Sequence, residues 1–130
     1  MNRGTDLSME LLHQEITEQI IGSAFEVYRV LGYGFLEKVY QRAMQVELQL
    51  RGCIAVMESE ISVTYKGVVV GPYSADLLVQ DSVVVELKVS KEYHSEDEPQ
   101  LLNELKATGI KVGLLINFGR TKVEFKRFIY

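Results

Sequence analysis

Asp76, Glu86 and Lys88 are the residues of this chain whose types and spacing could do chemistry. They lie in the segment SADLLVQDSVVVELKVS, which has the pattern of a tight β-hairpin. If residues 80–82 form the turn, Asp76 lies directly across from Glu86, because positions 76 and 86 are equally distant from 81. Side chains alternate between the faces of a strand, so all three charges then share one face. Facing carboxylates repel and need a cation or a proton between them, and a divalent metal ion with oxygen ligands meets that need.

The same residues also have an ordinary structural interpretation, because a Glu-x-Lys on a strand is often a solvated surface pair that contributes little stability. The neighbouring residues favour a site instead. Leu78 and Val84 share the face of the charges, and such nearly continuous apolar runs are typical of a strand covered on both faces. Charges on a covered strand need a compensating partner. The opposite face of the expected hairpin carries Leu77, Val79, Val83, Val85, Leu87 and Val89.

The elements around this hairpin follow from the spacing of apolar residues. Two N-terminal segments and one segment after the hairpin have helical spacing, whereas the middle third alternates as strands do. The apolar run KVGLLINF predicts a buried strand, and a helix between it and the hairpin implies at least one parallel pair in a mixed sheet. We expect helices over about 8–31, 35–50 and 95–108, and strands over about 54–65, 68–70, the two arms of the hairpin, 111–118 and 121–129, with Gly71-Pro72 as a break.

Length and composition restrict the class of protein. A chain of 130 residues predicts one domain over 1–130, and 47% hydrophobic with 25% charged residues is typical of soluble globular proteins. The single cysteine, Cys53, excludes an internal disulfide and a cysteine-based zinc cluster. No apolar stretch is long enough to span a bilayer or to act as a signal peptide, so we expect a cytoplasmic protein without a membrane partner.

The net charge of −4 argues against a protein that holds nucleic acid mainly by electrostatics. It does not exclude an enzyme with an acidic, metal-loaded site, because bound cations reverse the local field. The C-terminal stretch GRTKVEFKRF is an exception to the acidic balance. Its basic residues either contact phosphates or protect an edge strand from aggregation.

Two helical positions are further candidates. Glu37 is near the start of the second helix. Its functional interpretation is a third oxygen ligand or a carboxylate that positions water. Its structural interpretation is an acid stabilised by the helix dipole. Tyr40, one turn later, is expected to be a core residue whose hydroxyl reaches water. Gln100 at the start of the third helix could orient a water molecule or reach Lys88, although glutamine in a first helical turn is common.

The segment GFLEKVY resembles the signature of the GxxExxY protein family, with Gly34, Glu37 and Tyr40 in the named positions. The blocks SADLLVQDSVVVELK, QLLNELKATG and GLLINFG are similar to that family as well, so the resemblance covers about residues 10–128. This family is placed in the PD-(D/E)XK nuclease-like superfamily. The resemblance implies an α/β fold of the α+β type, with a restriction-endonuclease-like core of αβββαβ order around a mixed sheet and an extra N-terminal helix.

The resemblance also implies roles for individual residues. Asp76 corresponds to the first aspartate of the superfamily motif, and Glu86-Leu87-Lys88 corresponds to D/E-x-K. On this basis Asp76, Glu86 and the backbone carbonyl of Leu87 hold Mg²⁺ or Mn²⁺, and Lys88 positions the nucleophile or stabilises the transition state. Glu37, as the helical acid, binds a second ion or a metal-bound water.

Gln100 matches the helix-borne glutamine of some branches of the superfamily. Three residues depart from the family pattern, because Ala75 replaces the proline of "PD", Ser74 stands where many relatives have arginine, and Glu104 stands where many have an aromatic residue. A lost cation and an added acid favour weaker binding of phosphates.

The expected function is therefore a metal-dependent nuclease with nucleic acid as partner, DNA being favoured over RNA. The alternative is a catalytically weak or silent nuclease-fold module that binds nucleic acid or a protein partner, with a homodimer as one arrangement. Action on a small phosphorylated molecule is a third hypothesis.

Overall fold

The computed structural model describes residues 13–130, so the first part of the helix expected from about residue 8 lies outside the described residues. Five strands form one sheet in the order β1-β2-β3-β4-β5. The helices are α2 (Gln14–Leu31), α3 (Glu37–Leu50) and α4 (Glu98–Thr108), the last preceded by the 3₁₀ turn η1 (Ser95–Asp97), and the strands are β1 (Ala55–Tyr65), β2 (Val68–Val79), β3 (Val83–Lys88), β4 (Val112–Phe118) and β5 (Val123–Ile129).

The sheet is mixed, as the sequence predicts. Strands β1, β2 and β3 form an antiparallel meander, β3 and β4 are parallel, and β5 returns antiparallel along β4. The parallel pair is joined through α4, because a crossover is needed to bring two parallel strands side by side. The element order confirms the restriction-endonuclease-like αβββαβ core with an extra helix in front. Within residues 13–130, no helix combines the length and the apolar character needed to cross a membrane.

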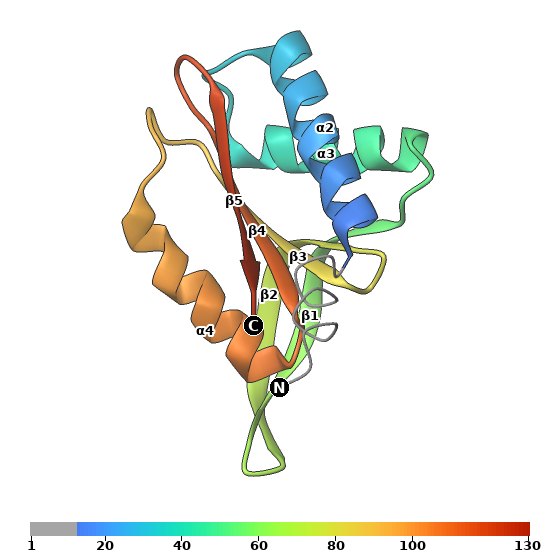
Figure 1. Ribbon diagram of the computed structural model, residues 1–130, viewed down its shortest axis with the longest axis vertical. Helices are drawn as coiled ribbons and strands as arrows, with labels where there is room; N and C mark the ends of the chain where they lie inside the picture. Colours follow the sequence, from blue (N-terminus) through green and yellow to red (C-terminus); the bar gives the residue numbers. More distant parts are fainter. Residues whose placement is uncertain (1–12) are drawn as a thin grey trace, which may run out of the picture.

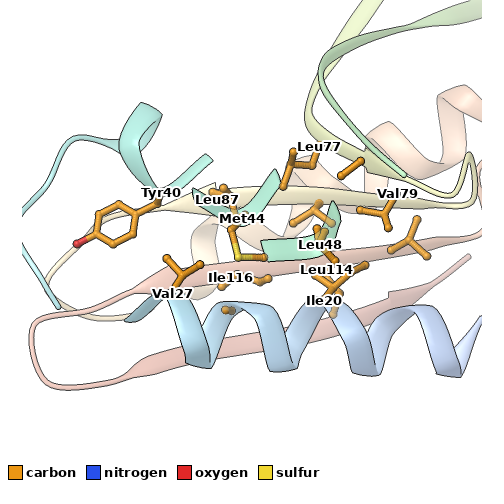
Figure 2. Packing of buried hydrophobic residues seen from close by; sticks show 14 of the residues in the cluster. Ile20, Val27, Tyr40, Met44, Leu48, Leu77, Val79, Leu87, Leu114 and Ile116 are labelled. Carbon is orange, nitrogen blue, oxygen red and sulfur yellow. The ribbon is translucent and has the colours of Figure 1, made fainter. Parts of the chain in front are cut away.

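Helices cover the sheet on both faces (Figure 1). One hydrophobic cluster joins α2 and α3 to the sheet, and Figure 2 shows Ile20, Met44 and Leu48 of these helices against Leu114 and Ile116 of β4. A second cluster joins Leu101 and Leu105 of α4 to the other face. Burial on both faces explains why β4 is apolar and fully buried along its length.

Strand β2 is longer than the sequence predicts. The expected break at Gly71-Pro72 is wrong, because β2 runs without interruption from Val68 to Val79 and Pro72 pairs with Ser62 of β1. Proline has no N–H to donate, so a strand tolerates it where one edge is unpaired. The described pairs between β2 and β3 begin only at Leu77, which leaves that edge of β2 free at Pro72. The β1–β2 hairpin consequently projects beyond the rest of the sheet (Figure 1).

The corner between α2 and α3 is held by Tyr40. Its side chain is fully buried and stacks on Phe118 with ring centroids 4.5 Å apart. The expectation that its hydroxyl reaches water is wrong, because the hydroxyl donates a hydrogen bond to the carbonyl of Gly32. Gly34 in this corner has φ 118°, a conformation that glycine adopts without strain. Helix α3 therefore begins at Glu37, two residues later than predicted, and the corner fixes that first residue.

Gly113 and Gly71 offer a matched test of the packing between α4 and β4. A Cβ on Gly113 would lie 3.2 Å from methyl groups of Leu101 and Leu105, whereas a Cβ on Gly71 would meet nothing within 4 Å. We expect Gly113→Ala to lower the free energy of unfolding by about 1–3 kcal/mol through overpacking. Gly71→Ala should leave it unchanged or raise it by roughly 0.5 kcal/mol. Urea denaturation of both variants checks this, and equal stabilities would contradict the described packing.

Candidate functional site

The predicted hairpin register is confirmed. Val79 pairs with Val83 and Leu77 with Val85, so the same register places Asp76 opposite Glu86. The turn lies where the sequence predicts it, with the amide of Ser82 donating to the carbonyl of Val79 at 3.0 Å. Gln80 and Asp81 are the two central residues of the β-turn that this hydrogen bond closes, and their φ values of 54° and 55° lie in the left-handed region.

Asp76 lies where β2 separates from the β3 ladder. The last described pair of that ladder is Leu77 with Val85. Beyond it, the amide of Leu87 donates to Asp76 Oδ2 at 2.8 Å, so a side-chain carboxylate replaces a backbone acceptor. The carbonyl of Asp76 accepts a hydrogen bond from Gln41 Nε2 on α3 at 2.9 Å. Hydrogen bonds from β3 and α3 therefore converge on this residue.

The strands also change faces at this point. Strict alternation would put Tyr73, Ala75 and Leu77 on one face of β2. Leu77 packs with α2 and α3, whereas Ala75 and the partly buried Tyr73 pack in the cluster of α4 on the other face. In β1 the residue across from Asp76 is Glu58, whose φ is 52°. Left-handed φ is unusual for a non-glycine residue and often marks a functional or strained position. The change of faces brings Tyr73 to the same side of the sheet as Glu86.

Glu37 reaches this site from the first turn of α3. Burial raises the pKa of Glu37, the neighbouring Asp76 carboxylate raises it further, and Lys88 opposes the rise. The Glu37 and Asp76 carboxyl groups lie within hydrogen-bonding contact of each other. The structure thus brings together the leading helix and the two hairpin strands, as the sequence analysis expected.

Glu86 is enclosed by polar groups that the sequence did not reveal. Burial raises the pKa of Glu86 to about 8, and the carboxylates of Asp76 and Glu104 contribute to that rise. The Tyr73 hydroxyl donates a hydrogen bond to Glu86 Oε1, which partly opposes it. Burial also raises the pKa of Tyr73 and of Glu104, with which Tyr73 forms another hydrogen bond. Burial and the neighbouring carboxylates therefore favour the protonated form of Glu86 when no cation is near.

Gln100 and Lys88 line one small cavity together with Glu104. Its volume of about 30 Å³ is enough for an ion or for one or two water molecules. Gln100 is exposed, and its side chain lowers the pKa of Glu104, which burial raises. Behind Lys88, the buried side chain of Asn117 bonds both the N–H and the carbonyl of Ser90 at 2.9 Å, which fixes the chain that follows the lysine.

The charges of the site are not balanced by ion pairs. In residues 13–130, the ion pairs lie elsewhere and none includes Asp76, Glu86 or Lys88. Glu104 Oε2 is buried and has no hydrogen-bond partner among the described residues. Over the same residues, no three acidic, histidine or cysteine side chains are arranged so that they could hold a metal ion as they stand. The site thus brings several oxygen donors close together without an ion pair between them and Lys88.

Several site residues could not be identified as such from the sequence. Gln41 had one usable signal, because it is four positions after Glu37 and so lies on the same helix face. Glu58 and Tyr73 had none, since their places depend on the register and face change of β1 and β2. Glu104 was noted only as a departure from a family pattern, and the structure places it beside Glu86.

Comparisons with known proteins concern the fold and the family of the chain. Among solved structures, the chain resembles the crystal structure of SSO0001, with 17% identity and a TM-score of 0.52 over 93% of this chain and 60% of that one, so it spans about three fifths of the length of that protein. An alkaline exonuclease (LHK-Exo) from Laribacter hongkongensis shares 13% identity with a TM-score of 0.37, over 87% of this chain and 81% of its own. No curated protein gives a significant match. The model of the PD-(D/E)XK nuclease superfamily matches residues 14–128, and this chain therefore belongs to that superfamily.

Proposed function

We propose that this protein is a metal-dependent phosphodiester hydrolase that acts on nucleic acid. The observation that carries the proposal is the convergence of the Glu37, Asp76 and Glu86 carboxyl groups beside Lys88, where β2 leaves the β3 ladder. Nucleases of this superfamily act on nucleic acids and generally use divalent metal ions. The pattern of Asp76 and Glu86-Leu87-Lys88, with Glu37 on the preceding helix, resembles the superfamily motif.

The donor set fits a hard divalent cation such as Mg²⁺ or Mn²⁺. Asp76 and Glu86 with the carbonyl of Leu87 would hold the ion, and Glu37 would hold a second ion or a bound water, because carboxylate and carbonyl oxygens are the ligands such cations prefer. The unpartnered Glu104 oxygen and the crowding of Asp76 and Glu104 against the buried Glu86 support this fit, because a bound cation would offset the negative charge of these groups. A bound divalent ion would supply charge stabilisation on the phosphate and lower the pKa of a bound water.

The chain's own residues would complete the site. The ammonium group of Lys88 would stabilise the negative charge that develops on the phosphate, in a half-buried position where such charges interact more strongly than in water. Glu37 would orient the attacking water. Gln100 would bind substrate or water at the mouth of the cavity that it lines with Lys88. Leu87 N–H would hold the Asp76 carboxylate in one orientation through the bond at 2.8 Å.

A second candidate is a module of the same fold that binds nucleic acid or a protein without cleaving it. It is favoured by the hydrogen bond from the Tyr73 hydroxyl to Glu86, because this donor competes with a cation for a Glu86 oxygen. The two candidates differ in whether the site takes up a divalent ion at all.

Cleavage should depend on Asp76. We expect Asp76→Asn to reduce the rate on nucleic acid by about 10²-fold or more, since it removes a charge while keeping the shape of the side chain. Asp81→Asn at the exposed hairpin turn is the matched control and should cleave as the natural chain does, because asparagine accepts a left-handed φ. The assay uses single-stranded, duplex and branched DNA and RNA with Mg²⁺ or Mn²⁺. Undiminished metal-dependent cleavage by the Asp76 variant would refute the assignment.

Metal binding should stabilise the fold through Glu86. At an Mn²⁺ concentration about 100 times the dissociation constant, we expect the melting temperature to rise by roughly 5–15 °C over the metal-free protein. The rise should disappear in Glu86→Gln, which keeps the hydrogen bond to Tyr73 but loses the charge. Differential scanning calorimetry with Mn²⁺ and with EDTA measures it. A natural chain that shows no such rise supports the non-catalytic candidate.

Without metal, the raised pKa of Glu86 should make stability depend on pH. Folding raises this pKa from 4.5 to about 8. The contribution of the Glu86 side chain to the free energy of unfolding is therefore complete below about pH 4.5 and is lost as the pH rises through 8. Between about pH 5 and pH 8.5, we expect the free energy of unfolding of the natural chain to fall by roughly 1–3 kcal/mol more than that of Glu86→Gln. This is less than the full pKa shift would give, because Glu86 is only partly buried and solvent screens its charge. Urea unfolding in EDTA checks this, and parallel pH profiles would contradict it.

A further inference from the structure

Gln41 joins α3 to both strands of the β1–β2 hairpin. Its side chain is 5% exposed, and its amide nitrogen donates to the carbonyl of Asp76 at 2.9 Å and to Glu58 Oε1 at 3.1 Å. A glutamine amide has two N–H donors, so both are used. Ser74 Oγ donates to the other oxygen of Glu58 at 3.2 Å. One buried side chain thus connects the helix that carries Glu37 to the strand that carries Asp76.

The sheet does not fix Asp76 by itself. The described pairs of β2 with β3 stop at Leu77, and those with β1 pass from Leu77 to Ala75 without including Asp76. A backbone carbonyl left without a partner inside a protein costs free energy, so another donor must satisfy it. Gln41 supplies that donor, and it lies one helical turn from Glu37 on the same face of α3.

We infer that Gln41 is a positioning residue that fixes Asp76 against Glu37, and so sets the spacing of the two carboxylates. The part of this inference that concerns a metal ion rests on the proposed function, whereas the anchoring of Asp76 does not. Gln41 binds the backbone carbonyl of Asp76 and not its carboxylate, so it would act on a bound ion only through Asp76. Loss of its amide should therefore loosen Asp76 and weaken binding of the cation without removing any ligand.

The same helix contains a matched control. Gln45 is one turn after Gln41, and its Nε2 donates to the carbonyl of Ala55 in β1 at 3.0 Å. It makes the same kind of bond from the same helix to the same sheet, but at the first residue of β1, where it binds a backbone carbonyl other than that of Asp76. A purely structural effect of losing a glutamine amide should be similar at the two positions, whereas a positioning effect should appear only at position 41.

The experiment compares Gln41→Met with Gln45→Met, because methionine keeps the length of the side chain and removes both donors. The first measurement, made without metal, is the exchange rate and nitrogen chemical shift of the Leu87 amide, which donates to Asp76 Oδ2. The second is the affinity for Mn²⁺ by calorimetry. We expect Gln41→Met to speed exchange at Leu87 and to weaken Mn²⁺ binding by roughly 10–100-fold, as changes behind metal ligands typically do. Gln45→Met should leave both values unchanged.

The outcomes separate this inference from the proposed function. If Gln41→Met keeps the Leu87 exchange rate and the Mn²⁺ affinity of the natural chain, or if both variants change equally, the positioning role is wrong. If the natural chain binds no Mn²⁺ but Leu87 exchange still depends on Gln41, the proposed metal chemistry fails and the anchoring of Asp76 stands. Should Gln41→Met not fold, Gln41→Asn keeps the amide but is too short to reach Asp76, and it should show the same two changes.

Discussion

The separation of β2 from the β3 ladder at Asp76 is the constraint on which the rest of the site depends. Beyond the last described pair at Leu77, a carboxylate takes the amide of Leu87 that a backbone carbonyl would accept in a continued ladder. This hydrogen bond holds the acidic side chain of Asp76 between two strands. A charged group in such a place needs a partner, because burial without one costs free energy. It also releases the carbonyl of Asp76, which Gln41 of α3 then binds. One local departure from sheet geometry therefore joins the hairpin to the leading helix.

Electrostatic crowding at this point has a clear physical cause. Glu37, Asp76, Glu86 and Glu104 approach one another with one neighbouring lysine, and burial together with mutual repulsion raises the pKa of Glu37, Glu86 and Glu104. Such an arrangement lowers stability at neutral pH unless a proton or a cation compensates it. The hydrogen bond from Tyr73 is a partial compensation. Strongly perturbed carboxyl groups beside a cavity are more typical of functional sites than of structural ion pairs.

The two hydrophobic clusters explain how the fold tolerates this arrangement. Helices α2 and α3 cover one face of the sheet, and α4 covers the other (Figure 1), so β3 and β4 are buried on both sides. Stability comes from these clusters, and the site lies at the edge of the smaller one, close to α4. Tyr40 links the larger cluster to the site, because its hydroxyl holds the corner that places Glu37 at the start of α3.

The sequence by itself determined the order of elements, the mixed sheet and the opposition of Asp76 and Glu86, because a tight turn and strict alternation are local properties of the hairpin. It also placed Glu37 near a helix start. Only the tertiary structure decided that Gln41, Glu58, Tyr73 and Glu104 surround these residues. The pairs next to the β1–β2 turn, such as Tyr65 with Val68, would place Glu58 opposite Ala75 if the register were constant. An irregularity between Val63 and Thr64 shifts the register by one residue, so Glu58 lies opposite Asp76. That shift and the change of faces at Asp76 arise from packing between segments far apart in the sequence, which no local pattern records.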